Sequence, residues 1–206
     1  MNIFDEIEKQ AVVPVFVGWN VEKALRDLTA LAEGGFRFVE IAIRTPVSVA
    51  LIKEASSIPN LVVGAGTVNN LQILDQAISA GAKFAVTPGL VKSVLTECIN
   101  SSVPIIPGIS TPSEILAALE NGASRLKLFP SESLGGLNYI NSLAGPFPDI
   151  MLMPSGGINE NNYNSYLQNK NVFSVSGSWM LPKGDSEMID IEKLNKLHFE
   201  ILNVNS

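Results

Sequence analysis

The chain has 206 residues, 46% of them hydrophobic, and a formal net charge of −6 at pH 7. This length suits a single domain over residues 1–206, and a modest negative charge without a Lys- or Arg-rich block argues against a nucleic-acid partner. No apolar run approaches the roughly 20 residues of a membrane span, and the acidic segment 2–10 lacks the positive charge of a signal peptide, so we expect a cytoplasmic protein with no membrane partner.

Short β-branched runs alternate with helix-like segments along the chain. Segment 21–35, for example, has apolar residues at helical spacing and ends in glycine, as is typical of a helix C-terminus. A strand-to-strand repeat of roughly 20 to 26 residues suits parallel strands joined by crossover helices. The predicted strands span residues 12–17, 36–43, 60–66, 82–88, 103–109, 124–130, 150–157 and 172–178.

These eight βα units predict an α/β fold, a compact TIM (β/α)8 barrel with its active site at the C-terminal strand ends. An open doubly wound sheet is less consistent with the sequence, because no GxGxxG motif follows the first strand. Segments 2–10 and 190–204 are predicted to be an extra N-terminal and an extra C-terminal helix outside the eight units.

The sixth predicted strand, "SRLKLFP", carries a lysine inside an apolar run. Alternate strand residues face opposite sides, so Leu126 and Leu128 should pack on the helices while Lys127 and Phe129 face the barrel interior. Loss of water there favours the neutral amine, which can attack a carbonyl and form a Schiff base. The alternative is a lysine that pairs with an internal carboxylate or extends to the rim.

The second predicted strand, "FRFVEIAI", offers a proton partner for this lysine. Glu40 and Arg44 have the parity opposite to Ile41, so both should face inward, with Arg44 closer to the mouth. A carboxylate beside a neutral lysine can take and return protons, and a rim arginine can hold a substrate carboxylate. A Glu40–Lys127 ion pair with only a structural role is the alternative interpretation.

Glycine and hydroxyl residues cluster after the last two predicted strands, in "PSGGI" (154–158) and "VSGSW" (175–179). Free backbone N–H groups in such loops suit a phosphate dianion, although two ordinary glycine turns would look the same. The segments "GAGT", "TPGL" and "IPGIST" look like pocket walls, with Thr67 able to donate a hydrogen bond, although each alone is more typical of an ordinary turn after a strand. No cluster of His, Cys and carboxylates has metal-ligand spacing, so we expect no metal and no cofactor.

These motifs resemble the bacterial 2-keto-3-deoxy-6-phosphogluconate (KDPG) aldolases, which also act on 4-hydroxy-2-oxoglutarate (KHG). The likeness covers nearly the whole chain. Its markers, in chain order, are "VEIAIRT", "GAGTV", "TPGL", "IPGIST", "KLFPSE", "GGLNYINSLAGPF", "PSGGI" and "GSW".

The resemblance implies a homotrimeric, metal-independent class I aldolase that splits the phosphorylated keto acid KDPG into pyruvate and glyceraldehyde 3-phosphate, and KHG into pyruvate and glyoxylate. By position, Lys127 matches the Schiff-base lysine of the family and Glu40 matches its acid/base. The matches to its other substrate-binding positions are Arg44, Thr67, Pro88, Phe129, Gly156, Gly157 and Ser178. Of these, the first two match groups that bind the pyruvoyl carboxylate, the next two match walls around the imine, and the last three match the phosphate turns.

The sequence departs from the family pattern in two places. Many relatives have an arginine where this chain reads Val17–Gly18–Trp19, and most have a glycine where Ser176 stands. Both departures should affect the choice of substrate more than the type of reaction. Two other functions stay open: a phosphosugar isomerase or epimerase, which usually needs a pair of acid/base groups, and a non-catalytic phosphosugar-binding barrel.

Overall fold

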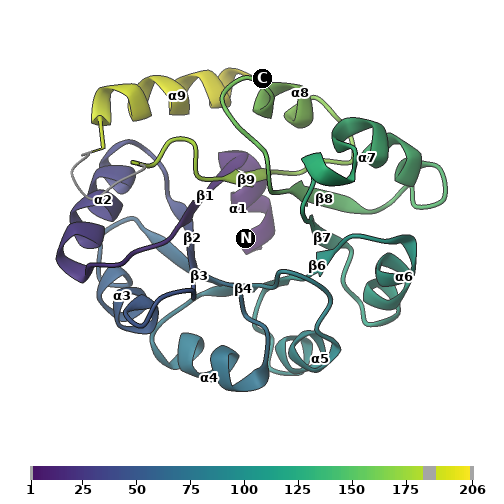
Figure 1. Ribbon diagram of the computed structural model, residues 1–206, viewed down its shortest axis with the longest axis horizontal. Coiled ribbons are helices and arrows are strands. Elements are labelled where there is room, and N and C mark those ends of the chain that lie inside the picture. Colours follow the sequence, from purple (N-terminus) through teal and green to yellow (C-terminus); the bar gives the residue numbers. More distant parts are fainter. Residues whose placement is uncertain (1, 183–188, 205–206) are drawn as a thin grey trace.

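The computed structural model describes residues 2–182 and 189–204, and its parallel strands curl around a common centre with helices outside them (Figure 1). The predicted domain span of 1–206 therefore includes positions 1, 183–188 and 205–206, which lie outside this description. The strands are β1 (Val12–Phe16), β2 (Phe38–Ala42), β3 (Val62–Gly66), β4 (Phe84–Val86), β5 (Ile105–Ile106), β6 (Gly108–Ile109), β7 (Arg125–Leu128), β8 (Met151–Pro154) and β9 (Val175–Gly177). The helices are α1 (Ile3–Gln10), α2 (Val21–Glu33), α3 (Ser48–Ala55), α4 (Leu71–Ser79), α5 (Lys92–Asn100), α6 (Pro112–Glu120), the 3₁₀ helix η1 (Glu132–Leu134), α7 (Gly136–Ala144), α8 (Tyr163–Leu167) and α9 (Ile191–Val204).

Short polar side chains set the starts of several helices. The side chains of Asn20 and Asn70 accept hydrogen bonds from backbone N–H groups in the first turns of α2 and α4. At α6, Thr111 and Glu114 form a reciprocal capping box, with Pro112 in the first turn. These caps satisfy N–H groups that have no partner inside the helix, and so they fix where α2, α4 and α6 begin.

The strands form an α/β fold with a curled parallel sheet. One set of ladder hydrogen bonds joins the strands in the order β5-β4-β3-β2-β1-β9, and a second joins β6-β7-β8. Two isolated parallel bridges, Leu152 to Val172 and Ser155 to Ser176, link the β8 region to the β9 region. The sequence order of the strands is thus followed around the centre in Figure 1.

The predicted strand 103–109 is interrupted at Pro107. Its first part, β5, pairs with β4, and its second part, β6, pairs with β7. Proline has no N–H group to donate to a ladder, so a break at this residue is physically expected. The two sheets therefore meet at Pro107.

The predicted alternation of strand residues is confirmed. Outward side chains such as Ile41 and Leu126 pack with the helices in one large core. Inward side chains form a second, smaller apolar cluster inside the curled sheet. Its buried members are Ile7, Val13, Phe38, Phe84, Val86, Ile106, Met153 and Phe173.

Helix α1 is an extra helix, as predicted, and it contacts the N-terminal ends of the strands. Ile7 packs into the interior cluster, and the Gln10 side-chain amide donates hydrogen bonds to the carbonyl oxygens of Val12 and Phe38. The Oε1 atom of Gln10 accepts hydrogen bonds from the backbone N–H groups of Arg37 and Phe38. This end of the interior is therefore covered by both apolar and polar contacts.

The predicted C-terminal helix is present as α9, but it is not extra to the βα units. Among the described residues after β9, α9 is the first helix, and it contacts both α8 and α2. Figure 1 shows it between those two helices, where the helix of the last βα unit belongs. The intervening segment lacks a strong helical pattern, so the sequence made α9 look separate. No helix among the described residues is long and apolar enough to cross a bilayer.

Candidate active site

A buried ion pair crosses the interior of the curled sheet. The Lys127 ammonium on β7 lies 3.0 Å from Glu40 Oε1 and 3.1 Å from Glu40 Oε2 on β2. Only 5% of Lys127 and 1% of Glu40 is exposed. Because β2 and β7 are not neighbours in either sheet, the two side chains meet across the centre. The loss of hydration on burying two ions nearly cancels their mutual attraction, so this ion pair adds little to the stability of the fold. A buried pair of ionisable groups is therefore a candidate for a functional site.

The Glu40 carboxylate fits because Gly66 on β3 has no side chain. A Cβ atom at Gly66 would lie 2.2 Å from Glu40 Oε1, far inside van der Waals contact. Gly64, one inward position below, likewise makes room for the Phe84 ring, which would lie 2.1 Å from an added Cβ. The "GAG" sequence is therefore needed for close packing inside the sheet.

Arg44 and Thr67, two of the predicted site residues, come together beyond the ends of β2 and β3. Arg44 is exposed just beyond β2, and its Nε donates a 3.2 Å hydrogen bond to Thr67 Oγ1 just beyond β3. Thr67 has φ of +62°, which is unusual for a β-branched residue. A strained backbone conformation persists only where the surrounding structure enforces it, and such conformations are most common at functional sites.

Phe129 connects the ion pair to the turn after β8. Its ring centroid is 5.8 Å from Lys127 Nζ, which confirms that the two residues share a face. A Cβ added to Gly156 would lie 3.1 Å from the same ring. The Phe129 ring thus lies between Lys127 and Gly156, the first glycine of the predicted phosphate turn.

Pro88 is held by a residue that the sequence analysis did not single out. The buried hydroxyl of Thr87 donates to the Gly89 carbonyl at 2.7 Å and accepts from the Gly108 N–H at 2.8 Å. Gly108 is in close contact with this segment, since an added Cβ would lie 2.6 Å from the Pro88 carbonyl carbon. The Pro88 turn is therefore fixed against β6.

The two predicted phosphate turns lie side by side. The Ser155–Ser176 bridge joins their strands, and a Cβ at Gly177 would lie 3.3 Å from the Ile158 carbonyl oxygen. Gly156 and Gly157 have φ of +88° and +90°, which residues with a side chain rarely adopt. The hydroxyl of Ser176 is buried and, within the described part of the chain, has no hydrogen-bond partner.

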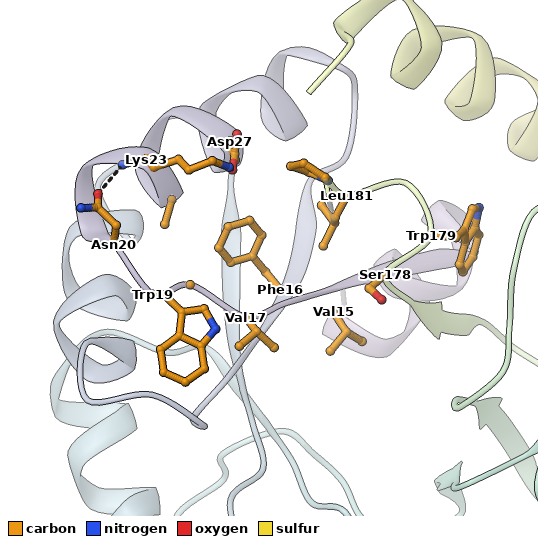
Figure 2. A pocket seen from close by; sticks show the side chains of 13 residues that line it. Val15, Phe16, Val17, Trp19, Asn20, Lys23, Asp27, Ser178, Trp179 and Leu181 are labelled. Atoms are coloured by element: carbon orange, nitrogen blue, oxygen red, sulfur yellow. Dashed lines mark hydrogen bonds and ion pairs between the residues drawn. The ribbon is translucent and has the colours of Figure 1, made fainter. Parts of the chain in front are cut away.

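Ser178 lies in a pocket of about 380 Å³ between β1, the start of α2 and the segment after β9 (Figure 2). The departures Val17 and Trp19 line this pocket, and 69% of Trp19 is exposed. Lys23 and Asp27 also line it and form an ion pair of 2.7 Å. The pocket lining contains neither Lys127 nor Glu40, so Ser178 is the only predicted site residue that it includes.

Lys23 and Asp27 do not stand out in the sequence, because they are part of an amphipathic helix pattern. Their spacing of four residues places them on one helix face, which is also the usual pattern of a surface ion pair. Among residues 2–182 and 189–204, no group of three or more His, Cys, Asp or Glu side chains could hold a metal ion.

A family model described as "KDPG and KHG aldolase" matches residues 3–197. The chain belongs to this family. The KHG/KDPG aldolase of Escherichia coli (strain K12) is 40% identical over 187 residues, which cover 90% of this chain and 88% of the relative. The 2-dehydro-3-deoxy-phosphogluconate aldolase of Dickeya dadantii (strain 3937) is 41% identical over 187 residues, with the same two coverages. The resemblance drawn from the motifs is confirmed.

Solved structures of KDPG aldolases have the same fold. The enzyme of Zymomonas mobilis ZM4, crystallised with 3-phosphoglycerate, superimposes with a TM-score of 0.89 at 35% identity, covering 96% of this chain and 94% of that one. The KDPG aldolase of Legionella pneumophila superimposes with a TM-score of 0.86 at 33% identity and 98% coverage of each chain. Its crystal holds pyruvate as a covalent carbinolamine intermediate.

Proposed function

We propose that this protein is a class I aldolase that forms a Schiff base through Lys127. It cleaves KDPG into pyruvate and glyceraldehyde 3-phosphate, and KHG into pyruvate and glyoxylate. The observation that carries the proposal is the buried contact of 3.0 Å between the Lys127 amine and the Glu40 carboxylate, in a chain that belongs to an aldolase family.

Lys127 and Glu40 can share the proton transfers of this reaction. Glu40 takes a proton from the lysine, and the neutral amine attacks the C2 carbonyl of the substrate to form a carbinolamine. Loss of water gives an iminium ion. Removal of the proton from the C4 hydroxyl then breaks the C3–C4 bond, releases the aldehyde and leaves the bonding electrons in an enamine. Protonation at C3, followed by attack of water on the iminium, frees pyruvate and the lysine.

The other predicted site residues orient the substrate in this proposal. The guanidinium of Arg44 binds the pyruvoyl carboxylate, and its 3.2 Å bond to Thr67 keeps both groups at the same end of β2 and β3. Pro88 and Phe129 form the walls beside the imine. Gly156, Gly157 and Ser178 bind the phosphate through backbone N–H groups and a hydroxyl.

Three further features belong to the proposal. The curled sheet is a single closed (β/α)8 barrel, which the bridges between the β8 and β9 regions support. The protein is a homotrimer, as in the family that it resembles, and light scattering coupled to gel filtration would measure this. A cytoplasmic location fits a substrate whose charged phosphate and carboxylate groups do not cross a bilayer unaided.

Reduction with borohydride in the presence of pyruvate tests the covalent step. Borohydride converts the iminium into a stable secondary amine, so mass spectrometry of the digested protein should place a reduced pyruvate adduct on Lys127. The Lys127→Arg variant keeps a cation beside Glu40 but has no amine that can become neutral. We expect it to show no adduct and to lose cleavage activity by several orders of magnitude.

Lys83→Arg is the matched control, because Lys83 is exposed and lies outside the site. This variant should form the adduct at the normal rate. An unmodified Lys127 in the wild-type protein, or pyruvate release by Lys127→Arg at the wild-type rate, would refute the proposal.

A further inference from the structure

The turn after β8 has its carbonyl groups tied to the segment after β7. The Ser155 carbonyl accepts from the Ser131 N–H at 2.7 Å, and the Gly156 carbonyl accepts from the Glu132 N–H at 3.1 Å. A peptide group is planar and trans, so its N–H points away from the donor that its C=O has engaged. The Gly157 N–H is therefore directed away from the segment after β7.

The next carbonyl, that of Gly157, is held by two asparagines that precede α8, one of which is its N-cap residue. The side-chain amides of Asn159 and Asn162 donate to it at 3.0 and 3.1 Å. The Asn162 amide orientation is fixed in turn, because its Oδ1 accepts from the Asn159 N–H at 2.8 Å. The Ile158 N–H then points away from these amides. Neither the Gly157 N–H nor the Ile158 N–H donates a hydrogen bond to any of the described residues.

Tyr166 holds the other side of the same turn through Glu132. Its hydroxyl donates a short hydrogen bond to Glu132 Oε1 and lies 3.3 Å from the Ser131 hydroxyl. Tyr166 is 1% exposed, and burial, together with the bond to Glu132, raises its pKa to about 12. The hydroxyl therefore keeps its proton and remains a donor throughout the physiological pH range.

Glu132 in this position supports the turn directly. A Cβ on Gly157 would lie 2.4 Å from Glu132 Cγ, so the glycine is packed on the side chain of the glutamate. Glu132 is exposed overall, and an unpaired carboxylate here would repel a bound phosphate. The bond from Tyr166 instead fixes one carboxylate oxygen on the buried side of the turn.

Asn162 and Tyr166 are four residues apart at the start and within α8, so they share one helical face. We propose that this face of α8 is a positioning device for the phosphate turn, with Asn162 acting on the Gly157 carbonyl and Tyr166 acting through Glu132. It holds the N–H groups of Gly157 and Ile158 ready for the phosphate of the substrate. Neither residue touches the substrate, and the inference rests on the proposed function.

Tyr166→Phe is the decisive variant, since it keeps the buried ring and removes only the hydroxyl. We expect its KM for KDPG to rise about tenfold, the size of one good hydrogen bond, with kcat changed less than twofold. For KHG, which has no phosphate, both constants should stay within twofold of the wild type. Asn162→Ala should give the same separation between the two substrates.

Two controls separate positioning from general destabilisation. Glu132→Gln still accepts from Tyr166 and should bind KDPG at least as well as the wild type. Ser165→Ala, at an exposed position of the same helix, should leave both substrates unaffected. An equal loss for KDPG and KHG in Tyr166→Phe, or no loss for either, would overturn the inference.

Direct binding distinguishes this inference from the proposed function. Calorimetric titration with 3-phosphoglycerate reports on the phosphate turn without any turnover. Weaker binding in Tyr166→Phe than in the wild type supports the positioning role even if neither keto acid is cleaved. Equal binding by the two proteins contradicts it even if the wild type is an active aldolase.

Discussion

The two ends of the interior of the curled sheet are built from different residues. Toward the N-terminal strand ends it is apolar, with rings such as Phe38 and Phe84 covered by Ile7 of α1. Toward the C-terminal ends it holds the Glu40–Lys127 pair, for which glycine leaves space. The first end gains stability by removing apolar surface from water, whereas the second gains little from its buried charges. Residues at the two ends should therefore respond oppositely when stability and activity are measured separately.

Among the variants that compare the two ends, Gly66→Ala should have the largest effect on activity. The added methyl group meets Glu40 Oε1 at 2.2 Å, so the carboxylate must move away from Lys127. A displacement of about 1 Å at a reacting group costs about 100-fold in rate, and we expect that loss in kcat/KM for pyruvate release. Gly145→Ala is the control, since its Cβ would have no atom within 4 Å. Full activity in Gly66→Ala would show that the geometry of the pair is unimportant.

Phe84→Ala should have the opposite effect. The buried ring fills space between Phe38 and Gly64, and its removal leaves a cavity. We expect the free energy of unfolding to fall by about 3 to 5 kcal/mol, measured by denaturant titration, while the folded protein keeps its chemistry. Leu71→Ala, at a position that is 46% exposed, should change stability by no more than about 0.5 kcal/mol. Similar free energies of unfolding for Phe84→Ala and Leu71→Ala would contradict the inference that the apolar end stabilises the fold.

Arg125→Gln should have the smallest effect. Arg125 joins α1 to β7 through contacts of 3.4 Å to Asp5 and 3.6 Å to Glu8, and its guanidinium stacks on Phe4. Since these ion pairs are partly exposed, we expect a loss of stability below about 1 kcal/mol, reduced further in high salt. Cleavage should not change. A loss of activity would link the apolar end to the end that holds the Glu40–Lys127 pair and weaken the contrast between them.

Strand parity made the central site predictable from sequence. Successive side chains of a strand point to opposite faces of the sheet. This alternation predicted that Glu40 and Lys127 face the interior and that Leu126 faces the helices. Because consecutive βα units place their strands side by side and parallel, the C-terminal ends of these strands were predicted to lie together. The ion pair, the Arg44–Thr67 contact and the adjacency of the glycine turns follow from these two rules.

The residues missed in the sequence are those whose roles depend on loop geometry. Asn162 and Tyr166 look like ordinary polar and aromatic positions of a short helix, because nothing local indicates that Glu132 lies within reach. The place of the final helix was misjudged for a related reason, since its packing against α2 and α8 is a long-range contact that its own sequence pattern does not indicate. Local propensity carries no information about such long-range contacts.

The Lys127–Glu40 contact joins positions 87 residues apart on strands that do not pair. The distance between the two side chains is therefore set by the curvature of the whole sheet and does not depend on any single loop. Loops at the strand ends, including the one bearing Val17 and Trp19, can therefore change in sequence without moving the ion pair.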